Sequence, residues 1–359
     1  MRNAYLYLKT VHFLEQEIKS GKYAPGDILP SDIELSRICG VSVATVRRAY
    51  QEFVNRGWIR RIKKKGTVLK DIFRNVPIKI GVITISDTPP FARILQGINS
   101  VLSTKGVPYI WLYNQDDIKE NESVLQHCLS EGFTGLIVVP PDIHSSTTLR
   151  KLVADGFPVV LLTRYGENFH CVCTDDYRCG YLIGEHFLKC GYRFPAAIYR
   201  DKPFGHERLE GFCEALAQGG LHLPRQRMFK VEFEEVQDLS HQHFCEREVE
   251  WLLSLEPRCD AVFVFNDHYA AGIYQHLLHR GLRVPRDIAV AGVDNLPQTM
   301  QPFPITTVDS GLEELGMRAA QLVLELHQNK PNFYVKEKIT PTLVVRSSTL
   351  PTPAAALSY

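Results

Sequence analysis

The chain has 359 residues, with 45% hydrophobic and 23% charged side chains, which predicts a folded protein of two or three domains and excludes a disordered one. Its net charge is only +1, but the first 74 residues hold 15 basic and 7 acidic side chains, whereas the other 285 hold 26 and 33. The positive charge is therefore concentrated at the N-terminal end, which indicates a segment that binds nucleic acid.

The sequence shows no sign of export or of membrane insertion. It opens Met1-Arg2-Asn3 without an apolar leader, and no stretch approaches the roughly 18 apolar residues of a membrane span. The nine cysteines are scattered and odd in number, which favours reduced thiols over a disulfide framework. Cys171, Cys173 and Cys179 lack a common zinc spacing and are expected to be buried. We therefore expect a cytoplasmic protein with no membrane partner, no metal and no cofactor.

The first seventy residues predict three helices followed by a basic hairpin. Apolar residues recur at helical spacing in the first helix, and Ser31 with Glu34 forms a capping box at the start of the second. Ser42 caps the third helix, and Gly57 ends it. The predicted helices begin near residues 7, 31 and 42, and the predicted strands span residues 58–62 and 67–69.

Two short helices separated by a tight turn and followed by a basic hairpin form a winged helix-turn-helix. In such a domain the N-terminal part of the second helix of the pair enters the major groove of DNA. A lysine-rich hairpin tip adds phosphate contacts that do not depend on sequence. A basic face that is merely solvated would explain the charge equally well, but it would not explain this order of elements.

Four motifs in this segment resemble the GntR family of bacterial regulators. They are YAPGDILPS at residues 23–31, GVSVATVR at 40–47, GWI at 57–59 and Gly66-Thr67. Ile33 and Val43 depart from the family, which often carries arginine at both positions. Arg47 is the best candidate for a base or phosphate contact. The resemblance implies DNA contacts by Ser42, Ala44, Thr45, Arg47 and Gly66, to which the local charge adds Arg48, Lys63, Lys64 and Lys65.

After an expected linker at residues 71–77, short apolar runs alternate with helical patterns. This alternation predicts an α/β fold with parallel sheets that helices cover on both faces. The units are too numerous for one ordinary sheet, so we expect two lobes. The predicted strands are residues 78–83, 107–113, 135–139, 159–162, 195–199, 261–265 and 288–293.

Polar and aromatic residues follow several of these strands, at the sheet edge where parallel sheets bind ligands. Carboxylate, amide and guanidinium groups together with aromatic rings suit a polyhydroxyl ligand. Each residue alone could instead be a helix cap or a surface charge. The candidate ligand-binding residues are Asp87, Phe91, Arg164, Arg208, Asn266 and Asp294.

Residues 78–349 resemble the effector domain of the LacI/GalR family, which is similar to periplasmic sugar-binding proteins. The motifs are RLEGF from residue 208, DAVF from 260 with Asn266-Asp267, VPRDIAVAGVDN from 284, TTV from 306 and LVVRSS from 343. The resemblance places Arg208, Asn266 and Asp294 at effector-contacting positions, and Arg164 where sugar-binding relatives have arginine. It implies an N-lobe of residues 78–174 and 307–331, a C-lobe of 175–306 and 332–349, and a flexible tail at 350–359.

A GntR-like domain at residues 1–70 joined to this effector domain resembles the architecture of arabinose-repressor-like regulators. The resemblance implies a homodimeric repressor of carbohydrate-utilisation genes that binds palindromic half-sites of operator DNA and is released by a sugar or sugar derivative. The sequence leaves a pentose, a hexose, a sugar acid and a sugar phosphate all open as the ligand. A cytoplasmic sugar-binding protein of the transport type is one alternative, which the DNA-binding domain disfavours. A nucleotide-dependent enzyme is another, but the turn at residues 85–90 lacks the G-x-G-x-x-G motif, so we expect no enzyme.

Overall fold

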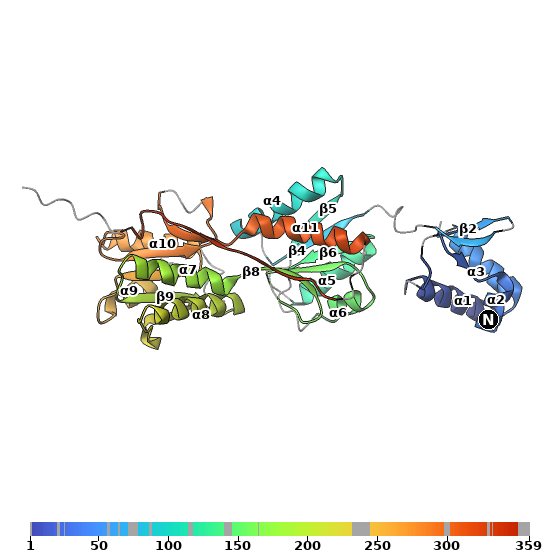
Figure 1. Cartoon of the computed structure of the whole chain (residues 1–359), viewed down its shortest axis with the longest axis horizontal. Helices are drawn as coiled ribbons and strands as arrows, with labels where there is room; N and C mark the ends of the chain where they lie inside the picture. The colour runs from blue at the N-terminus through green and yellow to red at the C-terminus, as the bar shows by residue number, and fades with distance from the viewer. Residues whose placement is uncertain are drawn as a thin grey trace, which may run out of the picture. The chain divides into compact units, whose positions relative to one another are not determined.

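The computed structural model forms two compact units, Met1–Ile78 and Lys79–Tyr359 (Figure 1). The predicted linker and the predicted tail beyond residue 350 lie outside the described residues. The structure describes residues 2–350 except 20–21, 25, 56–57, 64, 71–77, 86–87, 114–117, 140–145, 164, 232–244, 298–301, 329–330 and 332.

The first unit contains three helices that pack around one apolar core. Leu14, Leu35 and Phe53, one from each helix, are buried in this core. The predicted capping box is confirmed, because the Ser31 hydroxyl accepts a hydrogen bond from the Glu34 amide and the Glu34 carboxylate accepts one from the Ser31 amide. The helices are α1 (Arg2–Lys19), α2 (Asp32–Cys39) and α3 (Val43–Asn55).

A three-stranded antiparallel sheet of order β1-β3-β2 completes the first unit. The predicted basic hairpin is present as β2 and β3. The sequence did not predict β1, because a strand of two residues is too short to show an alternating pattern. The strands are β1 (Ile28–Leu29), β2 (Ile59–Ile62) and β3 (Gly66–Leu69).

The second unit contains two six-stranded sheets, and the predicted α/β fold is confirmed. The first sheet has the order β14-β8-β7-β6-β4-β5, with all neighbouring strands parallel. Helices α4 and α11 pack against each other, and α11 contacts this sheet. The strands of this first lobe are β4 (Ile80–Thr84), β5 (Tyr109–Tyr113), β6 (Gly135–Val138), β7 (Val159–Leu162), β8 (His170–Thr174) and β14 (Lys336–Ile339), and its helices are α4 (Pro89–Thr104), α5 (Ile118–Ser130), α6 (Thr147–Ala154) and α11 (Leu312–Gln328).

The second lobe has a sheet of order β10-β9-β11-β12-β13-β15, in which only the pairing of β13 with β15 is antiparallel. Helices α7 and α8 pack against each other, as do α9 and α10. The strands are β9 (Pro195–Arg200), β10 (Met228–Val231), β11 (Ala261–Val264), β12 (Ala289–Val293), β13 (Thr306–Asp309) and β15 (Thr342–Val344), and the helices are α7 (Asp176–Lys189), α8 (Pro203–Gln218), η1 (Arg225–Arg227), α9 (Glu246–Ser254) and α10 (Asp267–His279).

Two of the predicted lobe boundaries are wrong. Residue 307 was expected to begin the return to the N-lobe, but β13 continues to Asp309 in the second sheet beside β12. Residue 332 was expected to begin the return to the C-lobe, but β14 at residues 336–339 pairs with β8 in the first sheet. Such short strands carry no local signal for their partner, because strand pairing is decided by contacts distant in sequence. The chain therefore passes between lobes after β8, after β13 and after β14.

Two helix pairs approach so closely that only glycine fits where they cross. A Cβ atom added to Gly180 of α7 would lie 1.7 Å from the carbonyl oxygen of Arg208 on α8. In the first lobe, a Cβ atom on Gly97 of α4 would lie 1.9 Å from the carbonyl oxygen of Glu313 on α11. These crossings hold each helix pair as one rigid layer, and the first of them fixes the backbone that carries Arg208.

We predict that Gly180→Ala destabilises the second unit, because the new methyl group must force α7 and α8 apart. Overpacking of this kind costs about 1–3 kcal/mol of unfolding free energy, and more where backbone must move. Urea unfolding of the full chain measures it. Gly191→Asn is the matched control, since Gly191 has a φ of 82° that asparagine tolerates and no atoms near its Cβ position. Equal stability of the Gly180→Ala variant and the wild type would contradict this packing.

Candidate functional site

The start of α3 presents the predicted DNA-contacting residues of the first unit. The Ser42 hydroxyl caps the helix by accepting a hydrogen bond from the Thr45 amide at 3.2 Å, and the two hydroxyls are 2.8 Å apart. Ala44, which precedes Thr45 in α3, is exposed. In the hairpin, Gly66 begins β3 with a φ of 110°. Lys63 and Lys65 are exposed at the hairpin tip, whereas Lys64 lies outside the described residues. The helix start and the hairpin are thus free to meet a duplex.

One carboxylate that the sequence reasoning missed holds two arginines beside this helix start. Asp32 accepts from Arg47 Nε at 3.1 Å and from Arg61 Nη2 at 2.8 Å. The Arg47 side chain nevertheless stays 67% exposed, so its remaining donors can reach a base or a phosphate. Arg48 lies over the Tyr7 ring, 4.5 Å from its centroid. Because its partners are distant in sequence, Asp32 could not be singled out from spacing.

The second lobe brings Arg208 and Asp294 together in one buried cluster. Arg208 Nε donates to Asp176 Oδ1 at 2.7 Å, and Nη1 donates to the Phe265 carbonyl oxygen at 2.6 Å. Nη2 lies 3.6 Å from Asp294 Oδ1, which also accepts from the Ser310 hydroxyl at 3.0 Å. All three charged side chains are about nine-tenths buried, and burial raises the pKa of Asp176. This cluster lies at the carboxyl ends of β11 and β12, the ligand-binding edge of a parallel sheet.

The other predicted ligand residues differ in their surroundings. The Asn266 side chain caps α10 by accepting from the Tyr269 amide at 2.8 Å, which is the structural role that the sequence left open. Phe91 is half-buried in the first turn of α4. Asp87 and Arg164 lie outside the described residues, so the structure does not place them.

Asp267, which is not among the predicted ligand residues, is fully buried beside the carboxyl ends of β11 and β12. It accepts from the Thr307 hydroxyl at 2.6 Å and from the Leu296 amide at 2.9 Å. Burial raises the pKa of Asp267 to about 8, against the opposing effect of the Thr307 hydrogen bond. Asp267 is therefore a neutral acid at pH 7, and it connects the starts of α10 and β13 through uncharged hydrogen bonds.

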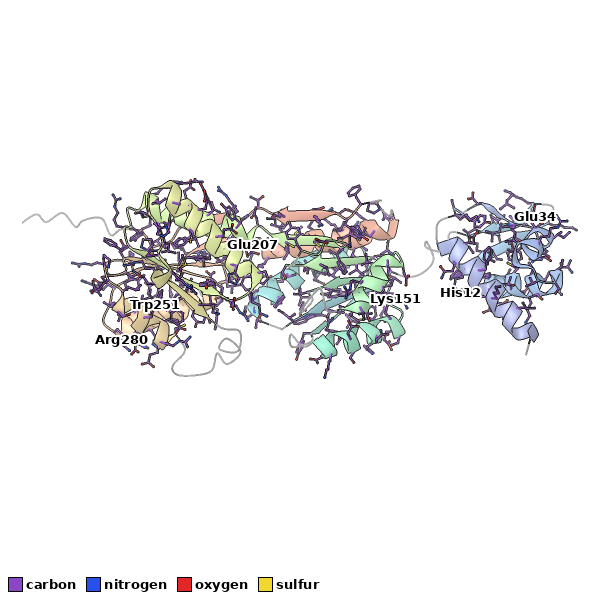
Figure 2. The ribbon with its side chains drawn as sticks, turned by 90° about the horizontal axis from the view of Figure 1, so that it is seen from below. His12, Glu34, Lys151, Glu207, Trp251 and Arg280 are labelled. Carbon is purple, nitrogen blue, oxygen red and sulfur yellow. The ribbon has the colours of Figure 1, made fainter. Side chains whose placement is uncertain are left out.

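Near the Arg208 cluster, a strand of the first lobe lies beside the start of α7 in the second lobe. Lys338 of β14 lies 3.6 Å from Asp175 and 5.7 Å from the Tyr165 ring centroid. Glu207 of α8, labelled in Figure 2, is half-buried here, and burial and then Asp176 raise its pKa. Acidic groups thus outnumber basic ones around Arg208 in the described part of the chain.

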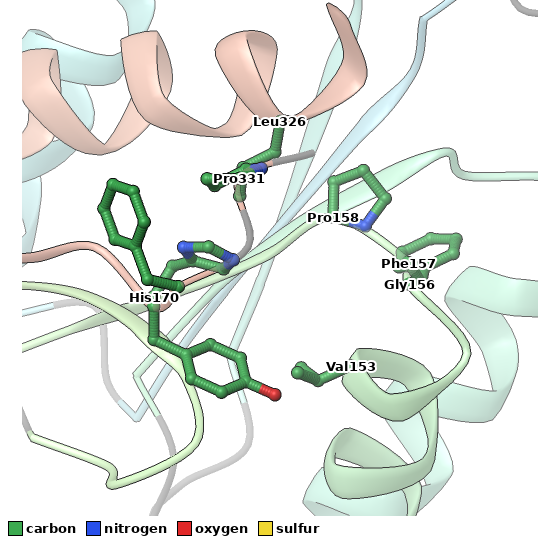
Figure 3. Close-up of a pocket in the computed structure, with 9 residues that line it drawn as sticks. Val153, Gly156, Phe157, Pro158, His170, Leu326 and Pro331 are labelled. Carbon is green, nitrogen blue, oxygen red and sulfur yellow. The ribbon is translucent and has the colours of Figure 1, made fainter. Parts of the chain in front are cut away.

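An apolar pocket of about 270 Å³ opens in the first lobe, beside the amino ends of two strands of its sheet (Figure 3). Phe157, Pro158 and His170 line it, and the last two mark the amino ends of β7 and β8. It therefore lies at the amino ends of strands of the first sheet, whereas the Arg208 cluster lies at the carboxyl ends of strands of the second sheet. Within the described residues, no group of three or more His, Cys, Asp or Glu side chains is placed to hold a metal ion.

Comparison with known protein families finds a match in each unit. The family described as bacterial regulatory proteins, gntR family, matches residues 6–69, and a periplasmic binding protein-like domain matches residues 185–349. The chain joins a GntR-family regulatory domain to a periplasmic-binding-protein-like domain. The assignment made from the sequence motifs is confirmed, as is the prediction of a DNA-binding transcription regulator. In the described residues no helix is long and apolar enough to cross a membrane.

Relatives are similar over most or nearly all of the chain. The arabinose metabolism transcriptional repressor of Geobacillus stearothermophilus is 27% identical over 96% of this chain and 97% of its own length. The transcriptional repressor PurR of Mannheimia succiniciproducens is 26% identical over 78% of this chain and 84% of its own. A LacI family regulator of Enterococcus faecium, solved with bound ribose, is 26% identical, with a TM-score of 0.65 over 77% of this chain and all of its own. All three are named as transcription regulators.

We predict that Asp267 makes the stability of the second unit fall as pH rises. The folded protein keeps a proton on Asp267 up to about pH 8, whereas the unfolded chain releases it near its ordinary pKa of 3.8. The free energy of unfolding should therefore decrease between about pH 4 and pH 8. Asp267→Asn keeps both hydrogen bonds, because its amide can donate to the Thr307 hydroxyl, and it removes this contribution.

Urea unfolding of wild type and Asp267→Asn at several pH values measures the effect. The unfolding free energy of Asp267→Asn minus that of the wild type should increase as pH rises from about 4 to 8. A constant difference across that range would show that Asp267 is ionised in the folded protein.

Proposed function

We propose that the protein represses carbohydrate-utilisation genes and that a sugar releases it from its operator. The observation that carries this proposal is the presence, in one chain, of an exposed Arg47 at a helix-turn-helix and a buried Arg208–Asp176–Asp294 cluster at a ligand-binding sheet edge. A relative named as an arabinose metabolism transcriptional repressor is similar along 96% of this chain, which includes both units. A regulator of genes acts where the DNA is, so we place the protein in the cytoplasm.

On the DNA side, we propose that α3 reads base edges while the hairpin holds phosphates. Ser42, Ala44, Thr45 and Arg47 belong to the helix start, and Arg48 lies one residue further. Lys63, Lys65 and Gly66 belong to the hairpin tip, where lysine charge supplies affinity without sequence preference. We propose the same role for Lys64, which lies between them in sequence. Asp32 limits the directions in which Arg47 and Arg61 can point, which favours one register on the duplex.

On the ligand side, we propose an uncharged sugar. Arg208 already donates to Asp176 and to the Phe265 carbonyl, and a second carboxylate, Asp294, lies 3.6 Å from its Nη2 atom, so two carboxylates surround one guanidinium group. Bringing a phosphate or carboxylate into such a buried site would be opposed by charge repulsion at low dielectric. Hydroxyl groups suit it, because carboxylates accept from them and guanidinium groups donate to them. Phe91, Arg164, Asn266 and Asp87 complete the proposed ligand contacts.

We further propose a homodimer that presents two winged helices to palindromic half-sites. Strand β5 is an edge strand of the first sheet, and its Ile110, Trp111 and Tyr113 are 37–45% exposed. An exposed apolar edge of this kind favours pairing with another chain, and a second copy would cover it symmetrically. Sugar binding would then change operator affinity by favouring one arrangement of the two lobes over another.

We predict that Arg47→Ala weakens binding to a specific DNA duplex by roughly tenfold to a hundredfold, as expected for a lost base contact. The duplex is first selected from random-sequence DNA by the purified wild-type protein. Fluorescence anisotropy measures the affinity, and affinity of the wild type should fall steeply as salt rises. Arg193→Ala in the second unit, where that exposed arginine lies, is the control and should bind normally. A flat salt response, or equal losses in both variants, would contradict the DNA side of the proposal.

We predict that uncharged aldoses such as L-arabinose or D-ribose raise the melting temperature of the full chain, whereas D-ribose 5-phosphate and L-arabinonate do not. Differential scanning fluorimetry measures this. Asp294→Asn keeps the shape of the cluster but removes a strong acceptor for hydroxyl groups, so the sugar-induced shift should shrink. A larger shift with the anions would refute an uncharged ligand, and an unaltered shift in Asp294→Asn would exclude Asp294 from the site.

A further inference from the structure

We propose that Arg93 of α4 is a positioning residue that connects the first lobe to the ligand-binding residue Asp294 of the second. Arg93 Nη1 donates to the carbonyl oxygens of Asp294 at 3.4 Å and of Asn295 at 3.1 Å. One guanidinium group of the first lobe thus binds both carbonyls of the turn that follows β12. The proposal rests on the sugar site proposed above, because it assigns a role to a residue next to that site.

The turn needs support because its backbone is strained. Asp294 has a φ of 104° and Asn295 a φ of 50°, a region that side chains other than glycine seldom adopt. Asn295 tolerates it, since asparagine is common in the left-handed region, but 104° lies outside that region for Asp294. Surrounding contacts must therefore hold Asp294 in place, and the Arg93 bonds are the ones that come from the other lobe in the described residues.

Further contacts of the turn come from its own lobe and from Ser310, which follows β13 where the chain passes between the lobes. The Asn295 side-chain amide donates to Asp309 at 2.8 Å and accepts from Arg346 at 2.7 Å. The Ser310 hydroxyl donates to the Asp294 carboxylate, and the Ser310 carbonyl accepts from Thr174 at 2.9 Å. Ser310 and Thr174 lie at two of the places where the chain passes between lobes. The conformation of Asp294 is thus tied to two of these crossing points as well as to Arg93.

Arg93 is anchored to a rigid layer. Helix α4 crosses α11 at Gly97 and Gly316, where an added Cβ atom would lie 1.9 Å and 2.0 Å from backbone oxygens of the opposite helix. The two helices lie side by side in the first lobe (Figure 1), and α11 contacts strands β6, β7 and β8. A shift of the Asp294 turn would therefore be passed to the whole layer or would break the Arg93 bonds.

Arg93 binds the backbone of Asp294, and the side chain of Asp294 is a proposed contact of the sugar. A sugar that binds the Asp294 carboxylate acts on the same residue whose carbonyl oxygen accepts from Arg93. Arg93 need not touch the sugar to affect it, because it holds the backbone from which the carboxylate projects. Two consequences follow for Arg93→Ala: the turn should open more often, and sugar binding should be weaker and less well coupled to DNA binding.

Hydrogen exchange of the unliganded full chain tests the first consequence directly. The amides of Asp294, Asn295 and Leu296 are bonded to the Val308 carbonyl, the Thr307 hydroxyl and the Asp267 carboxyl, so their exchange reports opening of the turn. In Arg93→Ala these amides should exchange roughly tenfold faster, as expected when a hydrogen bond to a charged group is lost. Amides of β11 should keep their rate. Arg93→Lys should restore part of the protection.

The matched control is Arg318→Ala. Arg318 lies on α11 and binds Glu325 and Glu337 within the first lobe, so its loss should leave the turn unaffected. Unchanged exchange at the turn in Arg93→Ala, or acceleration of the turn and β11 alike, would overturn the proposal. The measurement requires no sugar, so a failure of the sugar screen would refute the proposed ligand without affecting this result.

Sugar titrations then test the second consequence. With L-arabinose as the probe, Arg93→Ala should bind roughly tenfold more weakly than wild type and Arg93→Lys should lie between them. Accelerated exchange at the turn with unaltered arabinose affinity would overturn the positioning role.

Discussion

The second unit is organised around one guanidinium group. Arg208 of α8 binds a carboxylate at the start of α7 and the carbonyl oxygen of the residue that follows β11, and it approaches a carboxylate just after β12. Four elements distant in sequence therefore share one charged centre. A buried charge is stable only with such partners, so loss of any of them would leave another charge uncompensated. The same requirement gathers polar groups at the sheet edge where a ligand can be bound.

The strands that sequence reasoning found are those with continuous apolar runs, such as Val159–Leu162, which matches β7 to the residue. It missed short strands such as β14, whose alternating burial is that of an edge strand, and it misplaced two lobe boundaries for the same reason. Arg208 and Asp294 could be selected because each carries a family motif. Asp176 and Asp32 could not, because their roles depend on partners 32 and 15 residues away that only the folded chain brings near.

Both units use an acidic residue to orient arginine, but with different exposure. Asp32 is shared by two arginines at the surface, where solvent screens the charges and the pair contributes more to orientation than to stability. Asp176 is buried against Arg208, where the same pairing is needed to keep a charge inside the protein at all. The surface arrangement leaves most of the Arg47 side chain exposed, whereas the buried one surrounds Arg208 with acceptors.

Because the chain passes between the lobes three times, the first lobe is completed only late in synthesis. Residues 1–78 form a unit with its own core and can fold as soon as they leave the ribosome. The first lobe needs α11 and β14, so its sheet cannot be completed before residue 339 has been made. A nascent or prematurely terminated chain would therefore carry a finished DNA-binding domain without a finished sensor. Such a product could occupy DNA without responding to any sugar.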